Sequence, residues 1–507
     1  MSTVVIIGAG IGGMSAAARL AKAGHNVSVY ESSDTVGGKC RTEWIGRYAF
    51  DTGPSLLTLP AVYRDFFLKT GAPIESVLEL VPVNPSFDYR FSDGSNVTFA
   101  NLSRFQTLAA ISKSFGEQAS TQWNTLMLRA EKMWDLSREP FIESELRSPV
   151  SLLKRTSFLK DLLTIAPWKS LRALVKEETT NQHLQYIIDR YATYSGSDPR
   201  KAPAVLLSIA FVEEAFGAWH IKGGIGQLSQ AIYQRALDLG VTFVLNTPVK
   251  EIRNDGRKAT GVILENGETI PADVVVANAD ASDIYNHLLS PSLKRTKSER
   301  VSLSKSESSL AGFTLLLGLK PAPQQPRLQH HTILFPENYD AEFDSIFTQQ
   351  VPVENPTIYI CAPQDAAMVK ESGYESWSVL VNAPRHSDSG QGWNWADESF
   401  SRSYAAKIID HIEARGISVR DRLEVLEIRT PADLEKSVGA PGGSIYGTSS
   451  NGARAAFLRA KNRSPLENLY CVGGSAHPGG GLPLVGISAE IVSNAICEKQ
   501  NVQRGKS

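Results

Sequence analysis

The sequence has few cysteines, no long apolar run and almost no net charge. Its four cysteines, at 40, 361, 471 and 497, are far apart and form no CxxC pair. The sequence therefore predicts no metal site and no disulfide framework, and this cysteine usage is typical of a reducing compartment. The net charge of -1 argues against nucleic-acid binding that depends on overall positive charge. No stretch reaches the roughly 18 to 20 apolar residues that span a bilayer.

The length of the chain indicates more than one domain. At 507 residues the chain is too long for one hydrophobic core, so we expect two or three domains. The apolar run at residues 4–7 is too short for a secretory signal and leads directly into glycines. We therefore expect a cytoplasmic protein that is soluble or peripheral on one face of the cytoplasmic membrane.

The first thirty residues form a complete strand–helix–strand pattern. Residues 3–7, TVVII, predict a buried parallel strand, 14–23 an Ala- and Leu-rich helix, and HNVSVY a second strand that ends at Glu31. Between strand and helix lies GAGIGG, in which Gly8, Gly10 and Gly13 have the GxGxxG spacing. These glycines permit a tight turn, close approach to a pyrophosphate and packing of helix on strand.

The residues around this loop predict a bound dinucleotide. The pyrophosphate is expected at the helix N-terminus, where free N–H groups and the helix dipole favour an anion. Glu31, about twenty residues after the glycines, is placed to accept hydrogen bonds from a ribose diol and to repel the extra phosphate of an NADP-type ligand. NAD and FAD both remain open at this point.

Three separated segments complete the predicted α/β, Rossmann-like domain. Residues 240–280 alternate short β-rich runs with the turns NDG and ENG, and PADVVVANAD returns to a buried strand. Residues 467–474 predict another strand, and 486–499 a final helix. We assign 1–75, 220–290 and 465–507 to the nucleotide domain, and 76–219 and 291–464 to an inserted α+β substrate domain.

The residues after Glu31 distinguish between the two dinucleotides. GGKCRT at 37–42 would bring backbone and Lys39 to the same pyrophosphate or its ribose. The order GxGxxG, Glu, GG[RK]xxT resembles the flavin-containing amine oxidase and phytoene desaturase superfamily, and FDTGPSLL at 50–57 resembles that superfamily's loop beneath the flavin. The resemblance implies FAD.

A second glycine cluster, GGSAHPGGGLPLVG at 473–486, narrows the resemblance. It cannot be a regular helix or strand interior, but it can bring bare backbone to a flat ligand and start a helix after Pro483. GGxxHPGGGxP, with GAWHIKGGIGQLSQAI at 217–232, is similar to the phytoene and related carotenoid desaturases along nearly the whole chain. The cofactor-binding residues expected from motif and resemblance are Gly8, Ala9, Gly10, Ile11, Gly12, Gly13, Glu31, Gly38, Lys39, Gly53, Pro54, Ser55, Val249, Gly474, Pro483 and Leu484.

The resemblance implies a desaturase that extends the conjugation of a linear C40 or C30 carotenoid precursor by hydride transfer to the flavin. It does not identify a catalytic base. His477 is a candidate, but the structural alternative is an imidazole that caps a backbone group in the HPG turn. His220 is expected to shape the chain crossover, and Glu213 and Glu214 to lie on a solvated helix face.

The implied substrate is a hydrophobic polyene that is found in bilayers. The basic, leucine-rich segment 151–176, which also contains Phe158 and Trp168, is a candidate membrane-docking pair of helices, although an ordinary helical hairpin explains it as well.

A quinone or oxygen is the expected electron acceptor. Alternatives are a flavin-dependent carotenoid isomerase, a flavin amine oxidase, and a non-enzymatic prenyl carrier similar to the GDP-dissociation inhibitors, against which the intact glycine loops argue.

Overall fold

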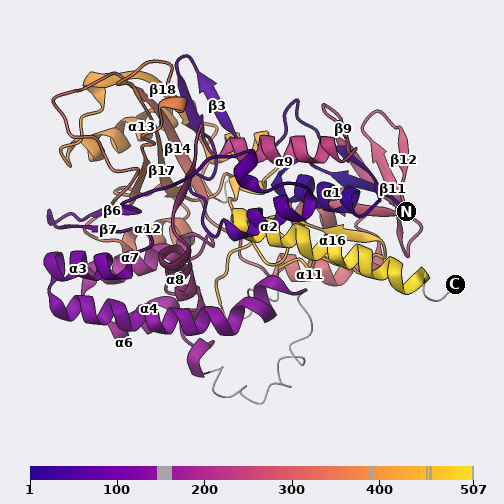
Figure 1. Cartoon of the computed structure of the whole chain (residues 1–507), viewed down its shortest axis with the longest axis horizontal. Helices are drawn as coiled ribbons and strands as arrows, with labels where there is room; N and C mark the ends of the chain where they lie inside the picture. The colour runs from indigo at the N-terminus through magenta and orange to yellow at the C-terminus, as the bar shows by residue number, and fades with distance from the viewer. Residues whose placement is uncertain (146–162, 389–391, 453–454, 456–458, 505–507) are drawn as a thin grey trace.

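The computed structural model describes residues 1–145, 163–388, 392–452, 455 and 459–504. A five-stranded parallel sheet forms one half of the molecule (Figure 1). In spatial order its strands are β19 Leu469–Cys471, β13 Val274–Ala277, β1 Thr3–Ile7, β2 Asn26–Tyr30 and β9 Thr242–Val244. The side chains of Val4, Val5 and Ile6 are fully buried, as expected for a strand that is covered on both faces. This order brings the first strand of the chain within one strand of the last.

Helices from both ends of the chain pack together on this sheet. Helix α1, Ile11–Lys22, contacts α9, Gly226–Asp238, and α16, Leu482–Arg504 (Figure 1). Helix α1 begins three residues before the predicted helix, at Ile11, because the small glycines of its first turn fit tightly against the strand. Helix α16 begins at Leu482 instead of residue 486, since proline is tolerated in a first helical turn.

Residues 240–280 divide between two sheets. As predicted, a three-stranded antiparallel sheet follows the parallel strand β9, with β10 Val249–Asn254, β11 Ala259–Leu264 and β12 Thr269–Pro271. Strand β13 then returns to the parallel sheet between β1 and β19.

The other half of the molecule contains a seven-stranded mixed sheet and a layer of helices. In spatial order the strands are β18 Leu423–Arg429, β14 Ala311–Leu319, β17 Glu375–Ala383, β16 Ile358–Cys361, β15 His331–Leu334, β6 Phe87–Arg90 and β7 Asn96–Phe99. The helices are α3 Arg104–Phe115, α4 Glu117–Arg138, α6 Leu171–Glu178, α7 Gln182–Thr193 and α8 Leu207–Phe216, with α13 Glu398–Glu413 packed on the sheet beyond them (Figure 1).

Shorter elements complete the fold. They are the hairpin β3 Thr42–Ile45 and β4 Tyr48–Asp51, the pair β5 Leu80–Pro82 and β8 Trp219–Ile221, and the helices α2 Ala61–Thr70, α10 Ala281–Asp283, α11 Lys297–Ser304, α12 Asp340–Asp344 and α14 Pro431–Val438. No helix within the described part of the chain has both the length and the apolar character needed to cross a membrane.

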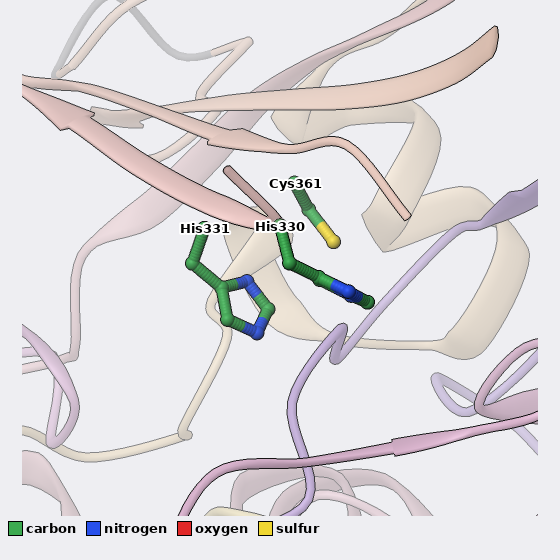
Figure 2. A group of neighbouring side chains, drawn as sticks. All are labelled: His330, His331 and Cys361. Atoms are coloured by element: carbon green, nitrogen blue, oxygen red, sulfur yellow. The ribbon is translucent and has the colours of Figure 1, made fainter. Parts of the chain in front are cut away.

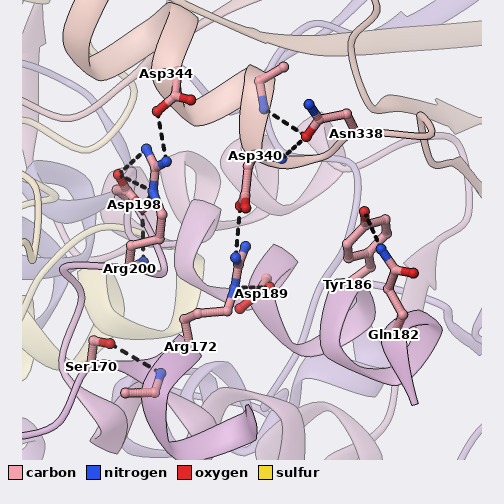
Figure 3. Close-up of polar contacts among 12 residues, drawn as sticks. Ser170, Arg172, Gln182, Tyr186, Asp189, Asp198, Arg200, Asn338, Asp340 and Asp344 are labelled. Atoms are coloured by element: carbon pink, nitrogen blue, oxygen red, sulfur yellow. Dashed lines mark hydrogen bonds and ion pairs between the residues drawn. The ribbon is translucent and has the colours of Figure 1, made fainter. Parts of the chain in front are cut away.

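Part of the basic segment 151–176 is buried and cannot serve as a docking surface. Residues 151–162, including Phe158, lie outside the described residues. In the remainder, the Arg172 guanidinium is buried between Asp189 of α7, at 2.5 Å, and Asp340 of α12, at 2.7 Å (Figure 3). The Leu171, Leu174 and Val175 side chains on the same helix are buried as well. The expectation that Arg172 and this leucine face meet a membrane is therefore wrong, because α6 uses them to pack on α7.

Candidate functional site

One large cavity runs between the two halves of the molecule. It has a volume of about 1450 Å³, and residues from both ends of the chain line it. Of the predicted cofactor residues, all but Ala9 and Gly13 border it: Gly8, Gly10, Ile11, Gly12, Glu31, Gly38, Lys39, Gly53, Pro54, Ser55, Val249, Gly474, Pro483 and Leu484. The tertiary structure thus gathers onto one surface residues that are separated by up to most of the chain length.

The glycine positions of the loop at residues 8–13 leave no room for side chains. A Cβ on Gly13 would lie 2.2 Å from the Gly8 carbonyl oxygen, and one on Gly8, which has a φ of +89°, would lie 2.7 Å from the Asn278 carbonyl oxygen. No described side chain caps the N-terminus of α1, whose N-cap is Gly10. Its first N–H groups therefore remain available to an anion in the cavity, which is how a pyrophosphate is bound at such a loop.

Glu31 is fixed at the cavity end of β2. Its carboxylate accepts hydrogen bonds from the backbone N–H groups of Ala9, at 2.6 Å, and Ser33, at 2.9 Å. These contacts orient the carboxylate and connect it to the glycine loop. Each carboxylate oxygen can accept more than one hydrogen bond, so Glu31 can also bind a ribose diol.

Lys39 is buried at the cavity wall and contacts a distant part of the chain. Its ammonium group donates hydrogen bonds to the carbonyl oxygens of Ser444 and Ile445, both at 2.9 Å. Burial lowers the pKa of Lys39 to about 8, although the nearby Asp280 opposes the shift. An anion bound next to this ammonium group would stabilise its charged form.

The FDTGPS loop is anchored to the middle of the sequence. Asp51 accepts hydrogen bonds from the Thr42 hydroxyl, at 2.6 Å, and from the Ile225 N–H, at 2.9 Å. Gly224 must be glycine, since it has a φ of +100° and its Cβ would meet the Thr42 hydroxyl oxygen at 2.4 Å. Burial raises the pKa of Asp51 to about 6. The WHIKGG segment therefore holds the loop that carries Gly53, Pro54 and Ser55.

The C-terminal glycine cluster forms a further part of the cavity wall, next to the glycine loop. A Cβ on Gly480 would lie 2.5 Å from the ring of Tyr446, so the bare backbone permits this packing. Directly afterwards α16 begins, with Pro483 and Leu484 at the cavity. The wall is thus bare backbone followed by a helix N-terminus that can stabilise negative charge on a ligand.

Two residues of this wall were not found from the sequence. The Asn278 side chain lies against the glycine loop, and a Cβ on Gly12 or Gly473 would meet its Oδ1 atom at 2.8 or 2.6 Å. The Arg459 guanidinium donates to the carbonyl oxygens of Tyr446, at 3.2 Å, and Gly474, at 2.8 Å. The position of Asn278 directly after a buried parallel strand was the signal available for it. Arg459 has no local motif.

His477 has a structural contact. Its Nε2 atom lies 2.8 Å from the carbonyl oxygen of Ser144, and burial lowers the pKa of the ring. The neighbouring Pro478, and not His477, borders the cavity. The imidazole therefore caps a backbone group, as in the structural alternative considered for the HPG turn.

Two glutamates contradict the expectation of a solvated helix face. Glu213 is buried and accepts hydrogen bonds from the hydroxyls of Tyr191, at 2.6 Å, and Tyr194, at 3.2 Å. The mostly buried Glu214 carboxylate pairs with Arg104. The prediction was wrong because the tyrosines and Arg104 that solvate these carboxylates come from α7 and α3, which the local pattern of α8 does not reveal.

His220 lies beside a cluster formed by two other histidines and a cysteine, and none of these four residues borders the cavity. The Nε2 atom of His220 lies 2.8 Å from Asp365, in accord with a structural role at the crossover. Close by, the potential metal-ligating atoms of His330, His331 and Cys361 lie within 4.8 Å of one another (Figure 2). Burial lowers the pKa of His330 to about 3 and raises that of the Cys361 thiol. The sequence did not predict that these three residues meet.

Comparison with known proteins identifies the family. Residues 11–327 match the family described as flavin containing amine oxidoreductase. The chain belongs to this family. A 1-hydroxycarotenoid 3,4-desaturase from Flavobacterium sp. (strain P99-3) is 34% identical over 98% of this chain and 99% of its own length. A 4,4'-diapolycopene oxygenase from Methylomonas sp. is 30% identical over 97% of each chain.

The solved structure of a putrescine oxidase has the same fold. It matches with a TM-score of 0.67 and 16% identity over 99% of each chain. The protein is thus an FAD-dependent oxidoreductase of the flavin-containing amine oxidoreductase family. Its glycine loop, the uncapped start of α1 and the fixed Glu31 carboxylate fit the nucleotide half of FAD.

Proposed function

We propose that the protein is an FAD-dependent desaturase that introduces conjugated double bonds into a linear carotenoid of C40 or C30 length. The observation that carries this proposal is the continuity of the cavity, in which the dinucleotide cradle opens onto a long apolar wall. The apolar residues are Trp134, Phe141, Ile142, Ile165, Val205, Leu206, Ile209 and Val212. The names of the two relatives, a carotenoid desaturase and a diapocarotenoid oxygenase, support a polyene substrate.

The proposed roles of the chain's residues follow from their positions around the cavity. Gly8, Gly10 and the start of α1 would bind the pyrophosphate, Glu31 the ribose, and the start of α16 the flavin ring. When bound, FAD accepts the hydride and the electron pair that a C–C bond loses on desaturation. The apolar wall would hold the polyene chain extended and exclude water.

We propose that the flavin half consists of 1–75, 220–290 and 465–507, and the substrate half of 76–219 and 291–464. In support, all five strands of the parallel sheet come from the first set of segments, and all seven strands of the mixed sheet come from the second. The cofactor would then lie at the carboxyl ends of parallel strands, where such folds bind dinucleotides.

We also propose that the protein binds peripherally to the cytoplasmic face of a membrane to obtain its substrate. Leu163 and Trp168 are 66% and 60% exposed, and Ile165 and Pro167 between them border the cavity. Exposed apolar side chains beside a cavity entrance suit contact with acyl chains. A quinone in the same membrane, or oxygen, would reoxidise the flavin.

The test is expression in cells that accumulate phytoene or its C30 analogue, followed by absorbance and mass measurement of the extracted polyenes. Desaturation removes two hydrogens per new double bond and shifts absorption to longer wavelength. An unchanged mass would indicate an isomerase, and a product that gains oxygen an oxygenase. Release of peroxide from amines by the purified protein, without conversion of polyenes, would indicate an amine oxidase and overturn the proposal.

A further inference from the structure

A buried cation lies in the cavity wall. Arg190, on α7, is only 6% exposed and borders the cavity. Its guanidinium carbon lies 4.7 Å from the ring centroid of Phe87 and 4.9 Å from that of Tyr194. The rings of Tyr89 and Tyr359 lie at 5.8 and 5.9 Å. Four aromatic rings therefore hold the guanidinium in a fixed position.

The charge of Arg190 is balanced within the wall. Its Nη2 atom donates to the hydroxyl of Tyr194 at 2.6 Å, and that hydroxyl lies 3.2 Å from the Glu213 carboxylate. Glu213 also accepts from Tyr191. Because cation and carboxylate form a neutral unit, an anionic ligand would be repelled by Glu213 as well as attracted by Arg190.

The guanidinium retains hydrogen-bonding capacity towards the cavity. It has five N–H groups, and among the described residues its acceptors are the hydroxyls of Tyr194 and of Tyr89, the latter at a long 3.4 Å. Next to it on the same wall, the hydroxyls of Ser55 and Tyr359 are 2.8 Å apart, and Tyr359 also contacts Nδ1 of His331 at 2.8 Å. We call Arg190, Tyr194, Ser55 and Tyr359 the polar cluster.

A pure hydrocarbon would use none of these groups. It would desolvate the polar cluster and leave the guanidinium N–H groups without acceptors, which opposes binding. A neutral hydroxyl or carbonyl oxygen would accept from the guanidinium and leave the charge balance unchanged. The rest of the chain would still contact the apolar wall.

We propose that the polar cluster binds the oxygen atom of a hydroxylated or carbonyl-bearing end group, so that the substrate is an oxygenated linear carotenoid. This inference rests on the proposed desaturase function and specifies its substrate class. Charged hydrogen bonds of this kind discriminate by about 10- to 100-fold. Arg190 is thus assigned as a specificity residue.

The experiment compares a linear polyene hydrocarbon with its 1-hydroxy derivative of equal conjugation, both supplied in liposomes to the FAD-loaded protein. Two quantities are measured: kcat/KM for each polyene, and the dissociation constant from the change in flavin absorbance under anaerobic conditions. The wild type is expected to favour the hydroxylated polyene by about 10- to 100-fold in both. Equal constants, or a preference for the hydrocarbon, would overturn the inference.

The variants test whether the preference arises at Arg190. The double variant Arg190→Met/Glu213→Gln removes both charges together, so that no buried charge remains unpaired, and is expected to abolish the preference. Arg190→Lys keeps a cation opposite Glu213 but has fewer donors, and should retain part of the preference. Arg422→Met/Glu375→Gln is the matched control, because Arg422 is also buried, pairs with Glu375 at 2.6 Å and lies over the Trp377 ring.

The outcomes separate this inference from the function on which it rests. Turnover of both polyenes with equal constants contradicts only the end-group assignment. If neither polyene binds or reacts with a protein that carries FAD, both proposals are contradicted. A preference that persists in Arg190→Met/Glu213→Gln, or disappears in Arg422→Met/Glu375→Gln, assigns the discrimination elsewhere and overturns the role of Arg190.

Discussion

A single carbon atom added at Gly13 is expected to disrupt the proposed nucleotide site. In Gly13→Ala the new methyl group would lie 2.2 Å from the Gly8 carbonyl oxygen, so the loop must open and the pyrophosphate cradle is lost. We expect the purified variant to lack flavin absorbance, as measured relative to the protein absorbance. Gly24→Ala is the control, because Gly24 has no neighbour within 4 Å, so that a Cβ there meets only the backbone strain of its φ of +89°. The Gly24→Ala protein should lose about 1 kcal/mol of stability and keep its flavin. A Gly13→Ala protein that still carries flavin would contradict the assignment of the glycine loop to the nucleotide.

Lys39 predicts a pH dependence of FAD affinity. Its pKa in the free protein is lowered to about 8 by burial, and a bound pyrophosphate would raise it again. FAD binding above pH 8 then takes up a proton, so affinity should fall as pH rises, by up to about tenfold per pH unit. Titration of the apoprotein with FAD between pH 7 and 9 measures this slope. In Lys39→Met the slope should vanish and affinity at pH 7 should be weaker, and an equal slope in both proteins would exclude Lys39 as its source.

At the scale of elements, the buried ion pair determines how α6 is attached. Arg172→Ala would leave the fully buried Asp189 carboxylate, whose pKa burial raises to about 7, without its cation. We expect a loss of about 3 kcal/mol in the free energy of unfolding, measured by urea denaturation of the FAD-loaded protein. Lys169→Ala on the same segment removes only the partner of Glu177, which is 54% exposed, and should cost less than about 1 kcal/mol. Equal losses would show that the burial of Arg172 is not what matters.

Element boundaries show where sequence patterns fail. The first strand was predicted at residues 3–7 and is found at Thr3–Ile7, because a β-branched run followed by glycines is a strong local signal. The start of α16 was missed by four residues because glycine and proline normally argue against helix. Glu213 was misplaced because burial of a polar residue depends on partners from another helix.

At the scale of the whole molecule, the exposed apolar residues beside the cavity predict membrane binding. The double variant Leu163→Asp/Trp168→Asp should lose most of its co-flotation with liposomes that contain anionic lipids, because it places charge where acyl chains would be contacted. Phe105→Asp/Leu128→Asp is the control, since these residues of α3 and α4 are also exposed, at 82% and 46%. Its flotation should equal that of the wild type. Equal loss in both variants would argue against a specific docking site.

The sequence alone predicted the local units of the proposed flavin half. Strand, glycine loop, helix and acidic residue follow each other within about thirty residues, and local chemistry is sufficient to specify such a unit. The terminal glycine cluster likewise carried its signal in its own composition. Only the tertiary structure decided the rest: the joining of both chain ends around one cavity, the burial of Arg172 and Glu213, and the position of Arg190 in the cavity wall. These features depend on contacts between residues far apart in the sequence, and the pattern around any one of them does not contain its partner.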